Sequence, residues 1–444
     1  MKKVKFINHY RWRAYPPSLN ADLPAHTVDC PECGQRISLP RLKRGQEAHC
    51  PRCGHEIVDV GKNPYIAPLA YATASLILMV FVYSMTFVTV TLAGITSILS
   101  LPSMMKQLIV SDFGFLAEVM FVLTFGSPLV FLLFCLYVYL ALLFDKVFPG
   151  LSYATRTLVR LRHFIMVDVF FISTLVAYIK LSSVAEVSLG AAFYLMLALA
   201  LMLIRTSVSI SEHWVYYKIN QILGRNAIEA PSEERVCCSR CLYFREKTEA
   251  TCGVCGADLY HRRPKSLSMS TAFLVAAVLL YIPANLLPIM ISSNPTVVQA
   301  NTIFNGIVYM WEEGDKLIAA IIFSASILVP GAKIVLLIVL NLSAHYGLPA
   351  NSKTMLKIYH FTDSVGKWSM IDIFVIIILM SSFHSYMARV VPGQAAVYFC
   401  LVVILTMLSA YFFDPRLLWD KSRYSKTITD RPSENVSDTQ YTYD

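Results

Sequence analysis

The chain contains 444 residues, of which 56% are hydrophobic and only 15% are charged. Soluble domains usually contain about 25% charged residues, so this composition excludes an ordinary soluble protein and indicates a membrane protein. The formal net charge is +9. The Lys and Arg side chains gather in alternate loops. This distribution is better explained by membrane topology than by nucleic-acid binding. We therefore expect no nucleic-acid partner.

The first 63 residues are polar and basic, without an apolar core followed by a small-residue cleavage site. We therefore expect no cleaved signal peptide. We assign residues 1–63 to an N-terminal tail with a first cysteine domain, and residues 207–269 to a linker with a second one. Residues 421–444 are polar and rich in Ser, Thr and Asp, which predicts a disordered tail.

The apolar runs of the chain predict an all-α, multi-pass membrane protein, because a spanning helix needs about 20 residues. We expect four helices in a first bundle at 64–206 and four in a second at 270–420. The eight runs are 65–95, 115–144, 164–182, 188–206, 270–291, 317–343, 368–383 and 394–412. Gly126 and Pro128 are expected to kink the run at 115–144, which is too long for a plain span.

Positive charge marks one side of the predicted topology. The loops at 145–163 and 344–367, the segment 207–269 and the C-terminal tail are rich in Arg and Lys, whereas the opposite loops are not. By the positive-inside rule, both termini and both cysteine domains lie in the cytoplasm.

The two halves of the chain repeat one another. "MVDVF" at 166–170 reappears 204 residues later as "MIDIF" at 370–374, and "SPLV" at 127–130 is matched by "VPGA" at 329–332. Such long-period similarity indicates duplicated units, each a cysteine domain followed by four helices. An even number of spans per unit gives a parallel repeat, related by an axis along the membrane normal.

Each half begins with two CxxC pairs. Four thiolates form the tetrahedral set that structural zinc prefers, although iron also suits four sulfurs and redox-active CxxC pairs are a weaker alternative. Cys237 could replace Cys238 as a ligand, but only Cys238 keeps the two-residue spacing. We predict two closed, structural metal sites formed by Cys30, Cys33, Cys50 and Cys53, and by Cys238, Cys241, Cys252 and Cys255.

Polar side chains inside the apolar runs are the candidate functional residues, because such groups are costly in a membrane. Ser326 shares a helix face with Lys333, and Ser369 shares one with Asp372. We expect Lys333 and Asp372 to pair across the bundle, with Thr406 also in the network. Outward snorkelling, or a purely structural pair, remains the alternative.

The first half differs from the second at these positions. It keeps Asp168 in "MVDVF" and has Lys180, but Phe131 stands at the position that matches Lys333. We therefore expect the second half to carry the working site, with Asp168 and Lys180 secondary.

Two prolines lie within "YIPANLLPIM" at 281–290. Each proline removes a helical hydrogen bond and can kink the helix. The segment is consistent with a hinge, in which Asn285 could satisfy freed backbone, or with the end of a span.

Several of these stretches resemble the paraquat-inducible protein A family of Gram-negative inner membranes, over the range from Cys30 to about Asp420. The most specific are "SLPRLKRGQ", "CPRCG", "YIPANLLPIM", "FSASILVP", "GKWSMIDIFVI" and "FDPRLLWD". The resemblance implies two zinc ribbons, eight spans, a periplasmic MCE-domain partner that forms a tunnel, and movement of lipids between inner and outer membranes. It also places Ser326, Lys333, Ser369, Asp372 and Thr406 where the family carries an intramembrane polar network. The residues "VPGAK" depart in detail from relatives with bulkier residues before the lysine.

No GxxxxGK[ST] motif for ATP is present in the sequence, so active transport would use a proton gradient or a partner protein. We expect a transport subunit, not an enzyme. The competing interpretations are a passive anchor for the tunnel and a membrane thiol oxidoreductase that uses the CxxC pairs.

Overall fold

The structure is a computed structural model, and it describes residues 5–8, 21–92, 95–110, 113–162, 165–182, 186–293, 298–312, 314, 316–346, 352–382, 384–385 and 388–420. The predicted disordered tail at 421–444 lies outside these residues.

The first repeat is a series of helices interrupted by short strands. Its elements are α1 (Ile66–Ser84), β6 (Val88–Leu92), β7 (Ile95–Leu99), α2 (Leu101–Val110), α3 (Gly114–Phe121), the π-helical turn η1 (Val122–Gly126), α4 (Ser127–Phe144), α5 (Leu151–Leu161), α6 (Val167–Ser182), β8 (Glu186–Leu189) and α7 (Ala191–Ser209).

The second repeat follows nearly the same order. Its elements are α9 (Ser266–Leu286), β11 (Met290–Ser293), β12 (Val298–Asn301), α10 (Ile303–Glu312), α11 (Lys316–Phe323), the π-helical turn η3 (Ser324–Leu328), α12 (Val329–Tyr346), α13 (Ser352–Trp368), α14 (Ile371–Ser382), β13 (His384–Ser385), β14 (Ala388–Pro392) and α15 (Gln394–Phe412).

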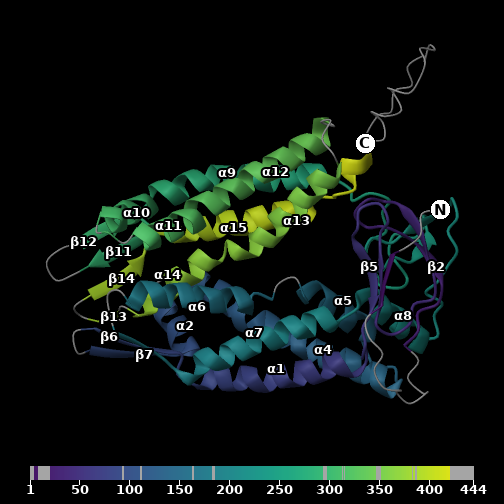
Figure 1. Ribbon diagram of the computed structural model, residues 1–444, viewed down its shortest axis with the longest axis horizontal. Coiled ribbons are helices and arrows are strands. Elements are labelled where there is room, and N and C mark those ends of the chain that lie inside the picture. Colours follow the sequence, from purple (N-terminus) through teal and green to yellow (C-terminus); the bar gives the residue numbers. More distant parts are fainter. Residues whose placement is uncertain are drawn as a thin grey trace, which may run out of the picture.

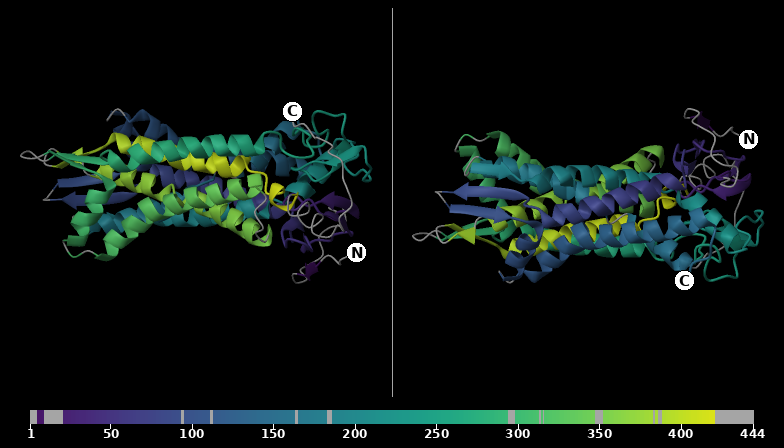
Figure 2. Two further views of the ribbon diagram at one scale, coloured as in Figure 1. Left: turned by 90° about the horizontal axis from the view of Figure 1, so that it is seen from above. Right: turned by 90° about the horizontal axis from the view of Figure 1, so that it is seen from below.

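The two repeats lie side by side as layers of one elongated bundle, with the cysteine domains at one end and the strands of the repeats at the other (Figures 1 and 2). They meet where α6 packs on α14. There the rings of Phe170 and Phe374 contact edge to face, with centroids 5.2 Å apart. These residues end the two copies of the repeated motif, so each repeat presents the same residue to the other, as a parallel repeat does where its helices pack beside the axis.

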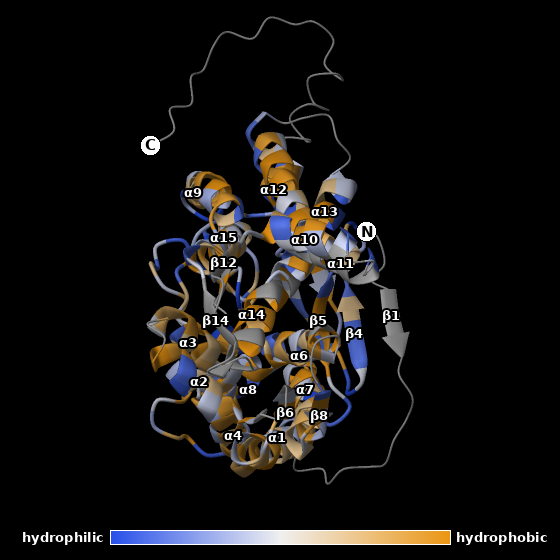
Figure 3. Ribbon diagram, turned by 90° about the vertical axis from the view of Figure 1, so that its left-hand side faces the viewer, coloured by the Kyte–Doolittle hydropathy of each residue, from blue (hydrophilic) through white to orange (hydrophobic). Residues whose placement is uncertain are grey.

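Six described helices are long and apolar enough to cross a membrane: Ile66–Ser84, Gly114–Phe144, Ala191–Ser209, Ser266–Leu286, Ser326–Tyr346 and Gln394–Phe412. Outward-facing apolar side chains such as Ile77 and Leu279 are 60% and 63% exposed, and the outer helices are largely hydrophobic (Figure 3). Exposed apolar surface on this scale is typical of contact with lipid. The chain is a multi-pass membrane protein.

The other two predicted runs form shorter helices. The run at 164–182 contains α6, of 16 residues, and the run at 368–383 contains α14, of 12 residues. In the second case, α13 ends at Trp368, and the turn at Ser369 and Met370 separates it from α14. Four spans per repeat therefore stays a prediction.

The prediction of an all-α protein is wrong in one respect: the chain is mostly helical, but its two repeats also contain two small antiparallel sheets. They have strand orders β7-β6-β8 and β12-β11-β14-β13. The run at 65–95 is predicted to be one helix. In the structure the helix ends at Ser84, and β6, "VTVTL", follows. Alternating β-branched residues favour a strand, and hydropathy alone does not separate this strand from the helix before it.

Each repeat has one long helix that is interrupted by a π-helical turn at the equivalent place: α3, η1 and α4 in the first repeat, and α11, η3 and α12 in the second. The Ser127 amide donates to the Val122 carbonyl, five residues earlier, and the cap residue of η3, Val329, does the same with Ser324. A proline follows each turn, and its ring excludes the carbonyl four residues before it. A one-turn shift to a five-residue spacing accommodates that ring, so the kink predicted near Gly126 and Pro128 takes this form.

The "YIPANLLPIM" segment ends a helix. Pro283 lies inside α9, which stops at Leu286, and Pro288 lies beyond it. The Asn285 side chain donates to the Tyr281 carbonyl at 2.8 Å. The segment thus fits the end of a span, followed directly by β11.

The cysteine domains consist of short strands around a single helix. The first has β1 (Lys5–Asn8), β2 (His26–Asp29), β3 (Arg36–Leu39), β4 (Gln46–His49) and β5 (Glu56–Val60). The second has β9 (Arg235–Cys237) and β10 (Phe244–Glu246), and α8 (Glu212–Ile222) joins it to the first repeat.

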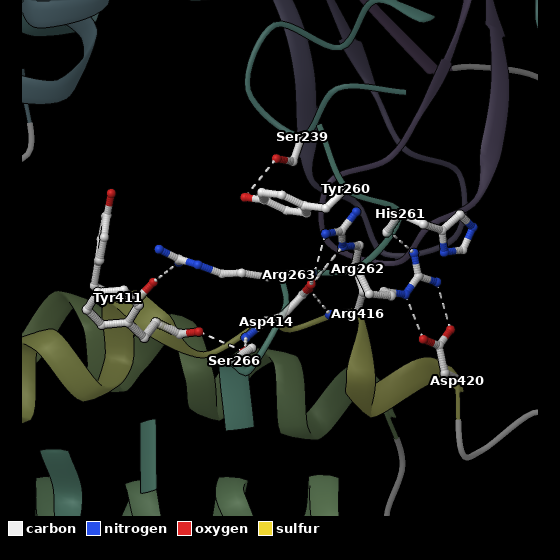
Figure 4. Close-up of polar contacts among 11 residues, drawn as sticks. Ser239, Tyr260, His261, Arg262, Arg263, Ser266, Tyr411, Asp414, Arg416 and Asp420 are labelled. Carbon is white, nitrogen blue, oxygen red and sulfur yellow. Dashed lines mark hydrogen bonds and ion pairs between the residues drawn. The ribbon is translucent and has the colours of Figure 1, made fainter. Parts of the chain in front are cut away.

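A buried ion pair fixes the end of α15 to the start of α9. Asp414 and Arg416 are 5% and 8% exposed, and the Arg416 guanidinium donates to the Asp414 carboxylate at 2.8 and 2.9 Å. The same carboxylate accepts the Arg263 amide, and the Asp414 amide donates to the Ser266 hydroxyl (Figure 4).

We predict that Asp414→Asn destabilises the protein by about 3–5 kcal/mol, because it leaves the Arg416 charge buried without its partner. The double variant Asp414→Leu/Arg416→Met removes both charges and should lose less. Thermal unfolding of the purified protein in detergent measures both. An equal loss in the two variants would show that the charge pair is not what matters.

Candidate metal and intramembrane sites

The first cysteine domain brings its four sulfurs together. Sγ of Cys30 lies 3.6 Å from Sγ of Cys53, and the Cys33–Cys50 distance is also 3.6 Å. Hydrogen bonds hold the backbone turns: the Gly34 amide donates to the Cys30 carbonyl, and the Gly54 amide donates to the Cys50 carbonyl. Both glycines have positive φ, +66° and +80°, which side chains rarely adopt.

The second domain repeats this geometry. Its Sγ distances are 3.6 Å for Cys238–Cys255 and 3.5 Å for Cys241–Cys252. A zinc–sulfur bond of about 2.3 Å gives tetrahedral edges of about 3.8 Å, so both clusters fit a tetrahedrally bound metal ion. Cys237 is buried outside the cluster and accepts the Asp29 amide at 3.5 Å, and Cys238 occupies the ligand position.

Mutual hydrogen bonding forces the thiol pKa values apart. Hydrogen bonds with the other three cysteines, Cys33 first, raise the pKa of Cys30 far above the ordinary thiol range. The bond from Cys30 is the largest cause that lowers the pKa of Cys50. Four thiolates at this distance repel one another, and a bound cation removes that repulsion, so metal binding releases protons and stabilises the domain.

Helix α8 lies between the two cysteine domains and contacts both. The Trp214 indole donates to the Ala21 carbonyl in the first, and His213 Nδ1 donates to the Cys241 carbonyl in the second. Burial lowers the pKa of His213 to about 3, with the neighbouring His26 contributing, so His213 is neutral at physiological pH. The two domains are thereby held in one unit.

Each cysteine domain also contacts the opposite repeat. Arg156 on α5 of the first repeat donates to the Cys255 carbonyl of the second domain at 2.8 Å. His360 on α13 of the second repeat lies 2.9 Å from the Glu32 carboxylate of the first domain. Arg52 of the first domain stacks on Trp419, 4.4 Å from the ring centroid. Each cysteine domain therefore reaches the repeat that does not directly follow it in the chain.

Lys333 is buried in the second repeat. Its side chain is 2% exposed, and its Nζ has no hydrogen-bond partner among the described residues. A Cβ added at Gly366 on α13 would lie 3.0 Å from that nitrogen and 3.7 Å from Met407 on α15. The ammonium group therefore lies where α12, α13 and α15 meet, and it does not snorkel outward.

Of the other predicted network residues, Ser326 lies in η3, Ser369 in the turn after α13, and Thr406 on α15. Ser326, Ser369 and Thr406 are all buried. Ser369 and Thr406 donate to carbonyls of their own helical turns, those of Val365 and Val403. No described hydrogen bond joins them to Lys333.

The predicted acid partner is only partly described. Asp372 is the second residue of α14, and its side chain lies outside the described residues, so the pairing with Lys333 stays a prediction. The side chain of Lys180 lies outside them too. Asp168 is half-buried in the first turn of α6, where its charge suits the helix dipole.

Sequence reasoning missed the role of Gly366 in this region. Gly366 provides the space for the lysine head, and Asp363 lies one turn earlier on α13. Gly366 opens the quoted "GKWSMIDIFVI" stretch, but only the packing shows that it faces Lys333.

These features define a class: a duplicated multi-pass membrane protein with two four-cysteine metal domains. The sequence profile described as Paraquat-inducible protein A matches residues 66–220 and 267–423, one match in each repeat. The chain belongs to the paraquat-inducible protein A family.

Curated relatives span nearly the whole chain. The chain is 32% identical to the Intermembrane transport protein PqiA of Escherichia coli (strain K12), over 90% of this chain and 97% of that protein. It is 30% identical to the Lipophilic envelope-spanning tunnel protein A of the same strain, over 88% and 90%. It is 26% identical to a Probable intermembrane transport protein of Haemophilus influenzae, over 89% and 96%. No solved structure matches the chain.

We predict that Cys252→Ser removes the metal ion of the second cysteine cluster and unfolds that domain, because structural zinc supplies folding energy directly. Elemental analysis of the purified protein, compared with the wild type, and limited proteolysis at 207–269 measure this. Cys237→Ser is the matched control and should keep the wild-type metal content. Loss of metal from the control, or retention in the Cys252 variant, would contradict the ligand assignment.

Proposed function

We propose that the chain is the bacterial inner-membrane subunit of an intermembrane lipid transport system. Its role is to load lipids into, or extract them from, a tunnel formed by a periplasmic MCE-domain protein, in support of envelope integrity. The names of its relatives, which speak of intermembrane transport and of an envelope-spanning tunnel, support this proposal. The proposal puts the termini and both cysteine domains in the cytoplasm, with structural Zn²⁺ in each domain, and gives the chain no enzymatic reaction.

The observation that carries the mechanism is the burial of Lys333 without a hydrogen-bond partner among the described residues. A charged ammonium in an apolar interior is costly unless it is paired or neutralised. Such a group can be accommodated in two ways, either by losing its proton or by an acid that moves to pair with it. Lys333 is thus suited to bias a two-state element.

The break between α13 and α14 supplies the movable part of the proposed mechanism. Gly366, against Lys333, lies just before the turn at Ser369 and Met370 where the helix is interrupted. We propose that protonation of the network, with Ser326, Lys333, Ser369, Asp372 and Thr406 as members, shifts α14 relative to α13. This movement switches the bundle between lipid-accepting and lipid-delivering states.

Lys333→Met tests this mechanism, since it keeps the length of the side chain and removes the charge. In a vesicle assay of labelled phospholipid transfer with the partner present, we expect a loss on the order of tenfold, equal to a coupling energy of ~1.4 kcal/mol. Partner binding and metal content should not change. Lys357→Met, at an exposed lysine of α13, is the matched control.

Gly366→Ala is the companion variant, because its added Cβ would press on the end of the lysine chain. We expect a smaller loss of transfer, since a flexible side chain can move aside. If Lys333→Met assembles with the partner and transfers lipid at the wild-type rate, the lysine has no part in the mechanism. The passive-anchor interpretation is then the better one.

A further inference from the structure

A third group of metal-ligating side chains lies outside both cysteine clusters. Glu32, His55 and His360 offer one carboxylate oxygen and two ring nitrogens, all within 4.8 Å of one another. Oε1 of Glu32 lies 3.3 Å from His55 Nδ1, and its Oε2 lies 2.9 Å from His360 Nε2. The two imidazole rings are nearly parallel, with planes 6° apart.

The distances suit a late first-row metal ion. Bonds of about 2.0–2.1 Å to nitrogen and oxygen place tetrahedral ligand atoms about 3.3–3.4 Å apart. The Glu32–His55 separation of 3.3 Å matches this value. The Glu32–His360 separation of 2.9 Å, to the other carboxylate oxygen, is a hydrogen-bond distance, so binding of an ion would lengthen it by about 0.4 Å. Two imidazoles and one carboxylate form a recurrent set for Zn²⁺ and related ions, with a remaining position for water.

Two of the three donors are held rigidly. Glu32 lies between Cys30 and Cys33, and His55 follows Cys53 by two residues, so both are carried on the turns that form the first cysteine site. The backbone of His55 is tied down by the bond from the Cys50 amide to its carbonyl, at 2.8 Å. Only His360 comes from a distant segment, α13.

The charge at Glu32 also favours a cation. Its side chain is only 10% exposed, and among the described residues its ion-pair partners are these two histidines. A nearly buried carboxylate is costly without a compensating positive charge, and a histidine provides one only when protonated. A divalent ion at this point supplies the charge and uses both imidazoles in their neutral form.

The equivalent position in the second cysteine domain has no such set of metal-ligating side chains. The 204-residue offset relates His360 to Arg156, which donates to a backbone carbonyl of that domain. The residues that match Glu32 and His55 within the cysteine motif are Arg240 and Ala257. A permanent cation docks the helix there, whereas the first domain presents ligands instead.

We propose that Glu32, His55 and His360 form a third metal site, for a divalent ion of the Zn²⁺ and Co²⁺ type, that fastens the first cysteine domain to α13 of the opposite repeat. His360 lies six residues before Gly366, or about 9 Å along the helix. An ion at this site therefore holds the helix that borders Lys333. That last consequence rests on the proposed function, whereas the metal site itself does not.

Cobalt binding to the full-length, tag-free protein in detergent tests the site. With the cysteine clusters filled by zinc and the third site first emptied by a mild chelator, added Co²⁺ should give one equivalent of d–d absorption without a thiolate charge-transfer band. His360→Ala should weaken this binding at least about 100-fold, since loss of even an outer-shell partner costs 10–100-fold. His345→Ala, at an exposed histidine of α12, should bind as the wild type does.

His360→Cys gives a gain of signal. A cysteine that ligates Co²⁺ at this position should add a thiolate-to-cobalt charge-transfer band that the wild type lacks. Zinc at two ions per chain in every variant shows that the cysteine domains are intact. Absence of the cobalt signal in the wild type, or equal binding by His360→Ala, overturns the proposal. Neither result depends on lipid transfer, so this test can fail without affecting the proposed function.

Discussion

The contact between α6 and α14 is the interaction on which the arrangement of the molecule depends. Phe170 and Phe374 are the same residue of the repeated unit, and they touch each other. A pseudo-two-fold axis that passes beside two equivalent residues produces such a contact. That axis places the equivalent helices on opposite sides of the bundle, puts both cysteine domains at one end, and brings each domain to the other repeat.

The two repeats differ at the positions that match Lys333 and Gly366, so the symmetry is not exact there. On one side the central helix carries Phe131, buried in an apolar core, and on the other it carries Lys333. Arg162 of the first repeat matches Gly366 of the second, and it donates to the Ser207 hydroxyl, whereas the glycine leaves room for the lysine. The first repeat thus has a positive charge at the end of α5, and the second repeat has one inside its bundle. The frame is common to both repeats, but only the second holds this buried lysine among the described residues.

The sequence predicted well those features that depend on local spacing. The CxxC pairs indicated the two four-cysteine clusters, because each pair spans only four residues, and six of the eight predicted apolar runs contain helices long enough to cross a membrane. Features that depend on packing were not predicted. The apolar run that becomes β6 reads as part of a helix, and the position of Gly366 against Lys333 requires the fold. His360 and Glu32 are 328 residues apart, and no period or motif joins them.

The π-helical turns carry information about the origin of the molecule. A π-helical turn is equivalent to one residue inserted into an α-helix, and it turns the following side chains by about 100°. It occurs at matching places in both repeats, each followed by a proline. Duplication of a unit that already contained this turn accounts for its presence in both halves. Two identical copies of such a unit could make the same contacts as a symmetric dimer in which each cysteine domain reaches the other copy. Joining the halves in one chain lets each carry different residues, as Phe131 and Lys333 show, which a homodimer cannot do.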